Sequence, residues 1–324
     1  MKFMKLFAAP LLLAAAIAVP PALAQAFPTR AITLIVPYPP GGSADILART
    51  FGEQLATRLQ QPVIVENKAG AGTAIGARFV ANAKPDGYTL LLGTVSSQAI
   101  NPAMNKVGYD PVKDFTVIGA LASIPFVLVT HAATPYHSIR ELIAASSASP
   151  GTISFASAGP GTSNHLAGEM LAKAAQINLL HVPYRGSAPA LADVLAGHVP
   201  LMFDLQTTAI PNLKSGKVRA LAVTGLQRSP LLPDVPTAAE SGLPGFEVSA
   251  WFGLFAPAKV APPVLERLSE AVTAVLRTPA MAQRLRDIGM EPDTHGVQQF
   301  ASYTAAEAGK YARIVKSAGL AAQP

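Results

Sequence analysis

The sequence predicts an α/β fold with two lobes, in which each lobe is a mostly parallel sheet flanked by helices. Short apolar runs rich in β-branched residues alternate with segments of helical periodicity along most of the chain, which is typical of parallel sheets. Loops rich in Gly, Ser and Thr join many of these apolar runs to the helical segments that follow them. The apolar stretch 115–129 is too long for an ordinary strand, so we expect two strands there that pass from one lobe to the other.

The first part of the chain repeats a unit of strand, loop and helix. We expect strands at 32–36, 63–65 and 88–92. The helix after the first strand ends before Pro62 and carries apolar residues at i+4 spacing, which are Leu47, Phe51, Leu55 and Leu59. The apolar residues of the next helix are Ile75, Phe79 and Val80.

The middle of the chain repeats this pattern. Ser138 and Glu141 have the spacing of a capping box, which predicts the start of a helix. Further strands are expected at 153–155, 179–182, 199–203 and 220–223. The helices between them carry Leu166, Met170 and Leu171, and then Leu191, Val194 and Leu195. Gly197 is placed to end the second of these helices.

The last part of the chain differs, because an apolar aromatic stretch at 246–255 precedes three helices. We expect those helices near 264–276, 279–288 and 300–318. The chain should return between the lobes within 236–249. These assignments predict a first lobe of residues 27–125 plus 245–324 and a second lobe of residues 126–244.

Residues 1–24 have the layout of a secretory signal peptide. Lys2 and Lys5 precede an uncharged apolar run, and small residues follow it, so cleavage after Ala24 or after Ala26 fits the A-x-A pattern. The run is too short for a transmembrane anchor, which needs about 20 apolar residues. We therefore expect export to the periplasm.

Composition and motifs exclude several functional classes. The formal charge of +6 becomes +4 without Lys2 and Lys5, and no Lys/Arg run is present, so we expect no nucleic acid partner. The chain has no cysteine, which excludes disulfides and thiolate metal sites. No P-loop, dinucleotide fingerprint or Gly-x-Ser-x-Gly elbow occurs, and the six histidines lack metal-ligand spacing. We expect no enzyme activity, no metal and no cofactor.

Four loops rich in Gly and hydroxyl residues are the candidate site, at 39–43, 70–73, 94–97 and 159–163. In a parallel sheet they share the edge at the carboxyl ends of the strands. Three of them lead into helix N-termini, which favour an anion. This composition suits a carboxylate, although Gly and Ser at such loops also serve ordinary turns and N-caps.

Single polar residues leave two interpretations open. His165 lies in a first helical turn and either donates to a ligand or is a packed helix residue, the interpretation we favour because a positive helix end disfavours an imidazolium. Arg185 either pairs with a distal carboxylate or is a solvated loop residue. Asp204 either accepts from a ligand amine or hydroxyl or caps a loop. Asp45 lies in a first helical turn, where an acid interacts favourably with the helix dipole, so we expect it to have a structural role.

Several motifs together resemble the tripartite tricarboxylate transporter substrate-binding proteins, the Bug receptors. The segments that carry the resemblance are 37–45, 69–76, 85–90, 157–162 with His165, 181–186 and 232–237. The likeness covers nearly the whole chain after the signal peptide. Two departures are Val117, where the family usually has Pro, and Arg185, where Lys is common.

The resemblance implies a two-lobed, type II-like periplasmic-binding-protein fold with hinge crossings, whose lobes close over a small carboxylate. It implies a dicarboxylate or tricarboxylate, an amino acid or an aromatic acid as that ligand. The family's two carboxylate-holding elements correspond to residues 38–43 and 159–162. The candidate ligand-binding residues are Tyr38, Gly41, Gly42, Ser43, Ala71, Gly72, Thr94, Ser97, Ser157, Gly159, Gly161, Thr162, His165, Arg185 and Asp204.

The partners implied by this resemblance are the membrane subunits of a tripartite tricarboxylate transporter, to which a monomeric receptor delivers its ligand. The sequence leaves open a second function, that of a co-receptor which docks on a sensor kinase. A periplasmic enzyme is the third class, and it would need a nucleophile, base or metal that no motif supports.

Overall fold

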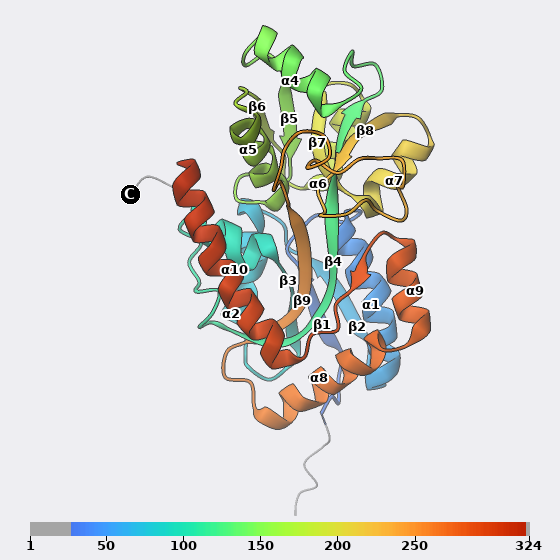
Figure 1. Cartoon of the computed structure of the whole chain (residues 1–324). Coiled ribbons are helices and arrows are strands. Elements are labelled where there is room, and N and C mark those ends of the chain that lie inside the picture. The colour runs from blue at the N-terminus through green and yellow to red at the C-terminus, as the bar shows by residue number, and fades with distance from the viewer. Residues whose placement is uncertain (1–26, 322–324) are drawn as a thin grey trace, which may run out of the picture.

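A strand of 17 residues, β4 (Phe115–His131), runs through the molecule and belongs to both of its sheets (Figure 1). Up to Pro125 it pairs with β9 (Ser249–Pro257), and from Phe126 onwards with β7 (Leu201–Leu205). The expectation of two separate strands is therefore wrong. The strand stays continuous because its bulges accommodate the bend and new partners take over at once.

The computed structural model describes residues 27–321, so the predicted signal peptide and its cleavage sites lie outside the described residues. Within the described part, no helix combines the length and apolar character that crossing a bilayer requires.

The first lobe is built on one sheet with the strand order β2-β1-β3-β9-β4, to which β10 adds along part of β4. Its other strands are β1 (Ile32–Val36), β2 (Val63–Asn67), β3 (Thr89–Thr94) and β10 (Glu291–Pro292). Its longer helices are α1 (Ser43–Leu59), α2 (Ala74–Ala81), α8 (Pro262–Leu276), α9 (Pro279–Asp287) and α10 (Val297–Ala318).

Three short helices lie in the loops of the first lobe. They are the 3-10 turn η1 (Ala71–Thr73), the π-helix η2 (Ser96–Ile100) and α3 (Asn101–Met104). The loop expected after β3 is thus largely helical, and its side chains are buried.

The second lobe uses the far half of β4, flanked by β8 (Val218–Val223) on one side and by β7, β5 and β6 on the other. Its remaining elements are β5 (Ser154–Ser157), β6 (Leu180–Pro183), α4 (Ile139–Ala148), α5 (Ser163–Ala175), α6 (Ser187–Leu195) and α7 (Gln206–Lys214). The predicted start of α4 is confirmed, since Ser138 Oγ accepts from Glu141 N at 3.2 Å. Helix α7 was not expected from the sequence.

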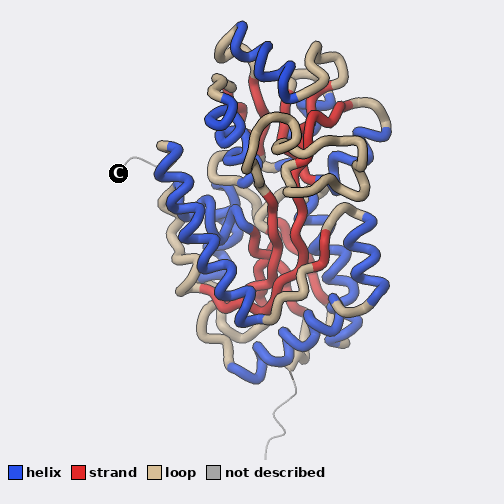
Figure 2. The backbone as a smooth tube through the Cα atoms, viewed as in Figure 1, coloured by secondary structure: helices blue, strands red, loops and turns tan. Residues whose placement is uncertain are grey.

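The α/β architecture with two lobes is confirmed, but the sheets are mixed. Among the named strands of the described residues, the parallel pairs are those of β2-β1-β3 and β7-β5-β6, while β4, β8, β9 and β10 add antiparallel pairs. The reason is that β4 leaves the first lobe and β9 returns to it, so the two crossings run in opposite directions. Figure 2 shows the strands in red, with helices in blue on either side. The lobe boundaries remain a prediction, which the change of partners at Pro125 and Phe126 supports.

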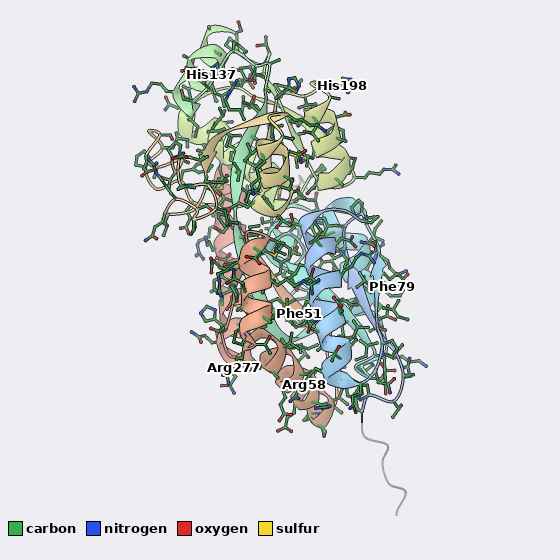
Figure 3. The ribbon with its side chains drawn as sticks, turned by 90° about the vertical axis from the view of Figure 1, so that its right-hand side faces the viewer. Phe51, Arg58, Phe79, His137, His198 and Arg277 are labelled. Atoms are coloured by element: carbon green, nitrogen blue, oxygen red, sulfur yellow. The ribbon has the colours of Figure 1, made fainter. Side chains whose placement is uncertain are left out.

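Helical periodicity identifies the buried face of α1 correctly and that of α2 only in part. Phe51 on α1 is fully buried, as are Leu47 and Leu55. On α2, Val80 is buried, but Phe79 lies at the surface with 47% of its area exposed (Figure 3). The Lys68 ammonium sits 4.4 Å from the centre of the Phe79 ring, which gives this exposed aromatic residue a cationic neighbour.

Candidate ligand-binding site between the lobes

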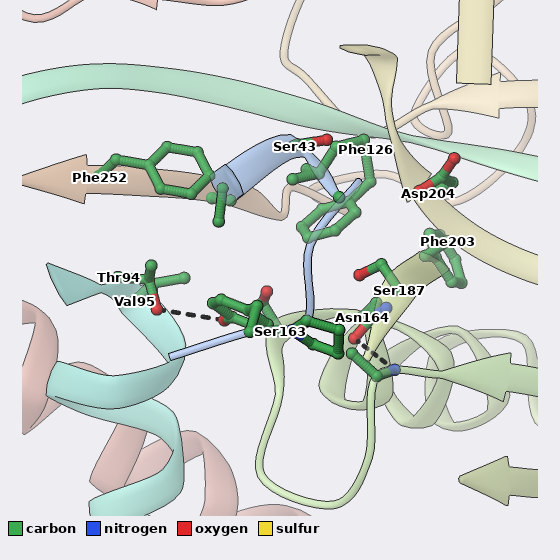
Figure 4. Close-up of a pocket in the computed structure, with 17 residues that line it drawn as sticks. Ser43, Thr94, Val95, Phe126, Ser163, Asn164, Ser187, Phe203, Asp204 and Phe252 are labelled. Atoms are coloured by element: carbon green, nitrogen blue, oxygen red, sulfur yellow. Dashed lines mark hydrogen bonds between the residues drawn. The ribbon is translucent and has the colours of Figure 1, made fainter. Parts of the chain in front are cut away.

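A small cavity of about 30 Å³ lies where loops of the two lobes meet (Figure 4). This is room for roughly two water molecules. The lining residues of the first lobe are Tyr38, Pro39, Gly42, Ser43, Ala44, Thr94, Val95, Ala250 and Phe252. Those of the second lobe are Phe126, Ala158, Ser163, Asn164, Ser187, Phe203, Asp204 and Leu205.

The two lobes touch beside this cavity. Ser163 N donates to Ser96 Oγ at 3.0 Å. Gly72 approaches Pro160 so closely that a Cβ atom on Gly72 would lie 2.1 Å from the Pro160 carbonyl oxygen. A side chain at this position would therefore keep the lobes apart, which explains the need for glycine in the loop.

Three helices of at least nine residues begin at the cavity. The first residues of α1, α5 and α6 are Ser43, Ser163 and Ser187, and all three line it. The N-cap residues of these three helices make no capping hydrogen bond with their own side chains, although Ser163 N at the start of α5 is bonded to Ser96 Oγ. The remaining N–H groups of the first turns and the positive dipole ends make this part of the cavity favourable for an anion.

Neutral hydrogen-bonding groups complete the polar wall. Tyr38 Oη lies 3.2 Å from Thr94 Oγ1, and burial raises the pKa of Tyr38 above its usual value near 10, so the phenol remains a donor. Asn164 Oδ1 accepts from Ala158 N at 3.2 Å and lies 2.8 Å from Thr162 Oγ1. These contacts occupy its oxygen, which leaves the Nδ2 amino group for a ligand.

Aromatic rings form the apolar walls of the cavity. Phe126 and Phe203 come from the second lobe, and Phe252 comes from the first. All three are at least 98% buried, and Phe203 stacks on Phe246 with 6.1 Å between ring centres. Rings held in this way exclude water and give the cavity a fixed shape.

Asp204 is the one carboxylic acid among the described residues that line the cavity. It is 2% exposed, its Oδ1 accepts from Thr208 Oγ1 at 2.8 Å, and its Oδ2 has no hydrogen-bond partner among the described residues. Burial raises the pKa of Asp204 to about 7, against the opposing effect of hydrogen bonds from Thr208 and the Leu205 backbone.

The structure brings five of the predicted site residues to this cavity: Tyr38, Gly42, Ser43, Thr94 and Asp204. Four others, Ala71, Gly72, Gly159 and Arg185, line a neighbouring cavity of about 700 Å³ that shares Tyr38, Pro39 and Ala158 with the first. The predicted site is therefore divided between the small cavity and a larger one beside it.

The remaining predicted residues shape loops next to the cavity. Ser97 Oγ accepts from Thr94 N, and Ser157 Oγ accepts from Gly159 N, both at 3.0 Å. The other residues in this position are Gly41, whose N–H donates to Asp45, Gly161, which packs on Asn101, and Thr162, the N-cap of α5. Direct contact between any of these residues and a ligand stays a prediction.

His165 is packed against other rings instead of lining either cavity. It is 6% exposed and stacks on His181 with 4.0 Å between ring centres. Burial, together with the neighbouring His165, lowers the pKa of His181 to about 4, so His181 is neutral near pH 7. This agrees with the favoured interpretation of His165 as a packed residue.

Asp45 has the structural role expected of it. Its carboxylate pairs with Arg49 at 2.9 Å and accepts hydrogen bonds from Gly41 N and Asn67 Nδ2. Although burial opposes this effect, the hydrogen bonds and the ion pair hold the pKa of Asp45 below its usual range. The loop before α1 is thereby fixed at the cavity.

Sequence reasoning missed several lining residues: Asn164, Ser187, Phe126, Phe203 and Phe252. For Ser187 a signal existed, because it is the first helical residue after a Gly-containing loop of the same kind as the others. The Phe residues gave no such signal, since an aromatic residue in a buried strand is ordinarily part of the core.

Comparison with known proteins identifies the family. The model described as tripartite tricarboxylate transporter family receptor matches residues 47–320. A protein from the tcbD-tcbE intergenic region of Pseudomonas sp. strain P51 is 43% identical over 82% of this chain and 80% of its own length. Protein BugT of Bordetella pertussis is 36% identical, with 92% of each chain covered.

Solved structures give the same result. The periplasmic binding protein BugD has a TM-score of 0.88 at 38% identity, covering 92% of this chain and 100% of BugD. R. palustris Rpa4515 with adipate has a TM-score of 0.88 at 34% identity, covering 90% of this chain and 98% of Rpa4515. MatC of Rhodopseudomonas palustris with bound malate has a TM-score of 0.85 at 34% identity, covering 89% of this chain and 100% of MatC. The chain therefore belongs to the receptor family of the tripartite tricarboxylate transporters.

Proposed function

We propose that this protein captures a small carboxylate in the cavity between its lobes and delivers it, in the periplasm, to the membrane subunits of a tripartite tricarboxylate transporter. The observation that carries the proposal is the convergence of the N-termini of α1, α5 and α6 on one cavity between the lobes. Helix N-termini bind carboxylates through their free N–H groups.

The surroundings support a carboxylate as the ligand. Tyr38, Thr94 and Asn164 offer neutral donors, and the aromatic walls exclude water, which strengthens each hydrogen bond to an anion. Adipate and malate, the compounds named for two related structures, are both small dicarboxylates. Binding without chemical change is part of the proposal.

A ligand screen tests the proposal. The mature protein is unfolded to remove resident ligand, refolded, and melted against a panel of small mono-, di- and tricarboxylates and amino acids. A ligand at 100 times its Kd adds about 2.7 kcal/mol of stability. We expect a clear rise in Tm with a carboxylate that is recovered unchanged. A flat panel, or recovery of an altered compound, would contradict the proposal.

A further inference from the structure

A pocket of about 290 Å³ lies at the surface along the junction of the two lobes. Its walls come from η1, α2, α3 and the loop after α3 in the first lobe, and from Pro160 in the second. Buried Asn101 holds the wall in place, because its Nδ2 donates to the carbonyls of Ala71 and Gly72 at 2.8 and 2.7 Å. Gly161 of the second lobe packs so closely on Asn101 that a Cβ atom there would lie 2.5 Å from Oδ1. The shape of this pocket therefore depends on contact between the lobes.

The rim of the pocket carries positive charge that has no counter-ion. Arg78 on α2 and Lys106 after α3 are exposed and line it, and Arg185 lines the adjoining cavity of about 700 Å³. No Asp or Glu is among the described residues that line either space. Within the described part of the chain, none of these three cations forms an ion pair. The surface is thus complementary to a partner that brings carboxylates.

Apolar side chains of α2 accompany these cations. Ile75 and Phe79 lie one helical turn apart, with 45% and 47% of their areas exposed. Phe79 is labelled at the surface in Figure 3. Gly70 fixes the position of Ile75, since a Cβ atom on Gly70 would lie 2.5 Å from Ile75 Cδ1. Exposed apolar residues that are rimmed by charged ones are typical of a protein interaction site.

We propose that the surface made by Ile75, Arg78, Phe79, Lys106 and Pro160, the docking surface, binds an acidic periplasmic segment of a membrane subunit of the transporter. Carboxylates of that segment pair with the two cations, and its apolar side chains cover Ile75 and Phe79. This inference rests on the proposed function, because it concerns how the captured ligand is delivered. Since the pocket depends on contact between the lobes, the subunit binds the closed receptor more tightly than the open one.

Charge reversal tests the docking surface. Binding of the receptor to proteoliposomes that hold the purified large and small membrane subunits is measured by co-sedimentation at low and high salt, with and without transported ligand. The variants are Arg78→Glu and Lys106→Glu, the second of which lies outside any helix. The matched control is Arg58→Glu, an exposed residue at the end of α1 remote from the cavity (Figure 3).

We expect Arg78→Glu and Lys106→Glu each to weaken docking at least about fivefold and to slow ligand uptake, whereas Arg58→Glu changes neither. Wild-type docking should be tighter with ligand than without, and it should weaken as salt rises. Calorimetry should give the same Kd for the ligand in all four proteins, which shows that capture is intact.

The outcomes separate the inference from the function on which it rests. Ligand uptake that is unaffected by both docking-surface variants would overturn the inference and leave delivery standing. Equal binding to phosphatidylglycerol vesicles without the subunits would assign the surface to lipid. Self-association of the receptor that Ile75→Glu abolishes, measured by sedimentation, would assign it to a second copy. Either result would also overturn the inference. Absence of wild-type uptake would overturn both proposals.

Discussion

Replacing Asp204 by Asn should change how the stability of the ligand-free protein depends on pH. The pKa of Asp204 rises from 3.8 to about 7 on folding, chiefly through burial. The folded protein thus holds a proton that the unfolded chain has already released between these values, and its stability falls as pH rises through this range. The gap corresponds to about 4 kcal/mol, a cost that Asn does not incur.

The assay is urea unfolding of refolded, ligand-free protein from pH 4 to pH 8, followed by the fluorescence of Trp251, the chain's single tryptophan. We expect the free energy of unfolding of Asp204→Asn, minus that of the wild type, to increase by about 4 kcal/mol from pH 4 to pH 8. A difference that stays constant over this range would refute the reasoning, because Asp204 would then be ionised throughout.

Asp45→Asn is the matched control, since Asp45 is also buried but has a lowered pKa. Its contribution to stability is present above the unfolded pKa and is lost as pH falls through the still lower folded pKa. The variant should therefore be less stable than the wild type by a nearly constant amount between pH 5 and pH 8.

Four other substitutions test the cavity between the lobes and the core. Gly72→Ala should weaken ligand binding at least about tenfold with little change in secondary structure, because its Cβ meets the Pro160 carbonyl; calorimetry and circular dichroism check this. Asn164→Asp should weaken carboxylate binding by repulsion yet preserve Tm, because an acid suits the first turn of α5; thermal melts with and without ligand distinguish the two effects. Phe51→Ala should cost about 3–5 kcal/mol and Phe79→Ala less than about 1, measured by urea unfolding.

The sequence predicted most of the fold because the spacing of apolar residues and the positions of Gly and Pro are local properties of the chain. The run 32–36 and the i+4 spacing of Leu47, Phe51 and Leu55 specify β1 and α1 without reference to the rest of the chain. Helix α7 escaped prediction because Pro211 lies inside it and its apolar residues follow no clear period. The length of β4 was recognised, but its continuity depends on which strands lie beside it.

The candidate site was harder to predict because it depends on how the lobes face each other. Ser43 and Thr94 were found, since both lie at loops on the carboxyl edge of the first sheet. Gly72 and Arg185 instead line the neighbouring cavity. Gly72 lies there because it packs on Pro160 across the lobe boundary. Whether Phe126 faces the core or a ligand depends on the position of the second lobe relative to the first. No local sequence pattern predicts that position.

The order of strands in the first sheet has a consequence for how the chain reaches its native state. Strand β9 lies between β3 and β4, although it follows β4 in the chain by more than a hundred residues. The first sheet cannot be completed until that late segment has been synthesised. Residues 126–244, by contrast, form one continuous stretch of the chain that begins with the far half of β4. We expect this inserted lobe to fold before the lobe that surrounds it, which reverses the usual N-terminal-first sequence of events. Closing so long a loop should make formation of the first lobe the slow phase.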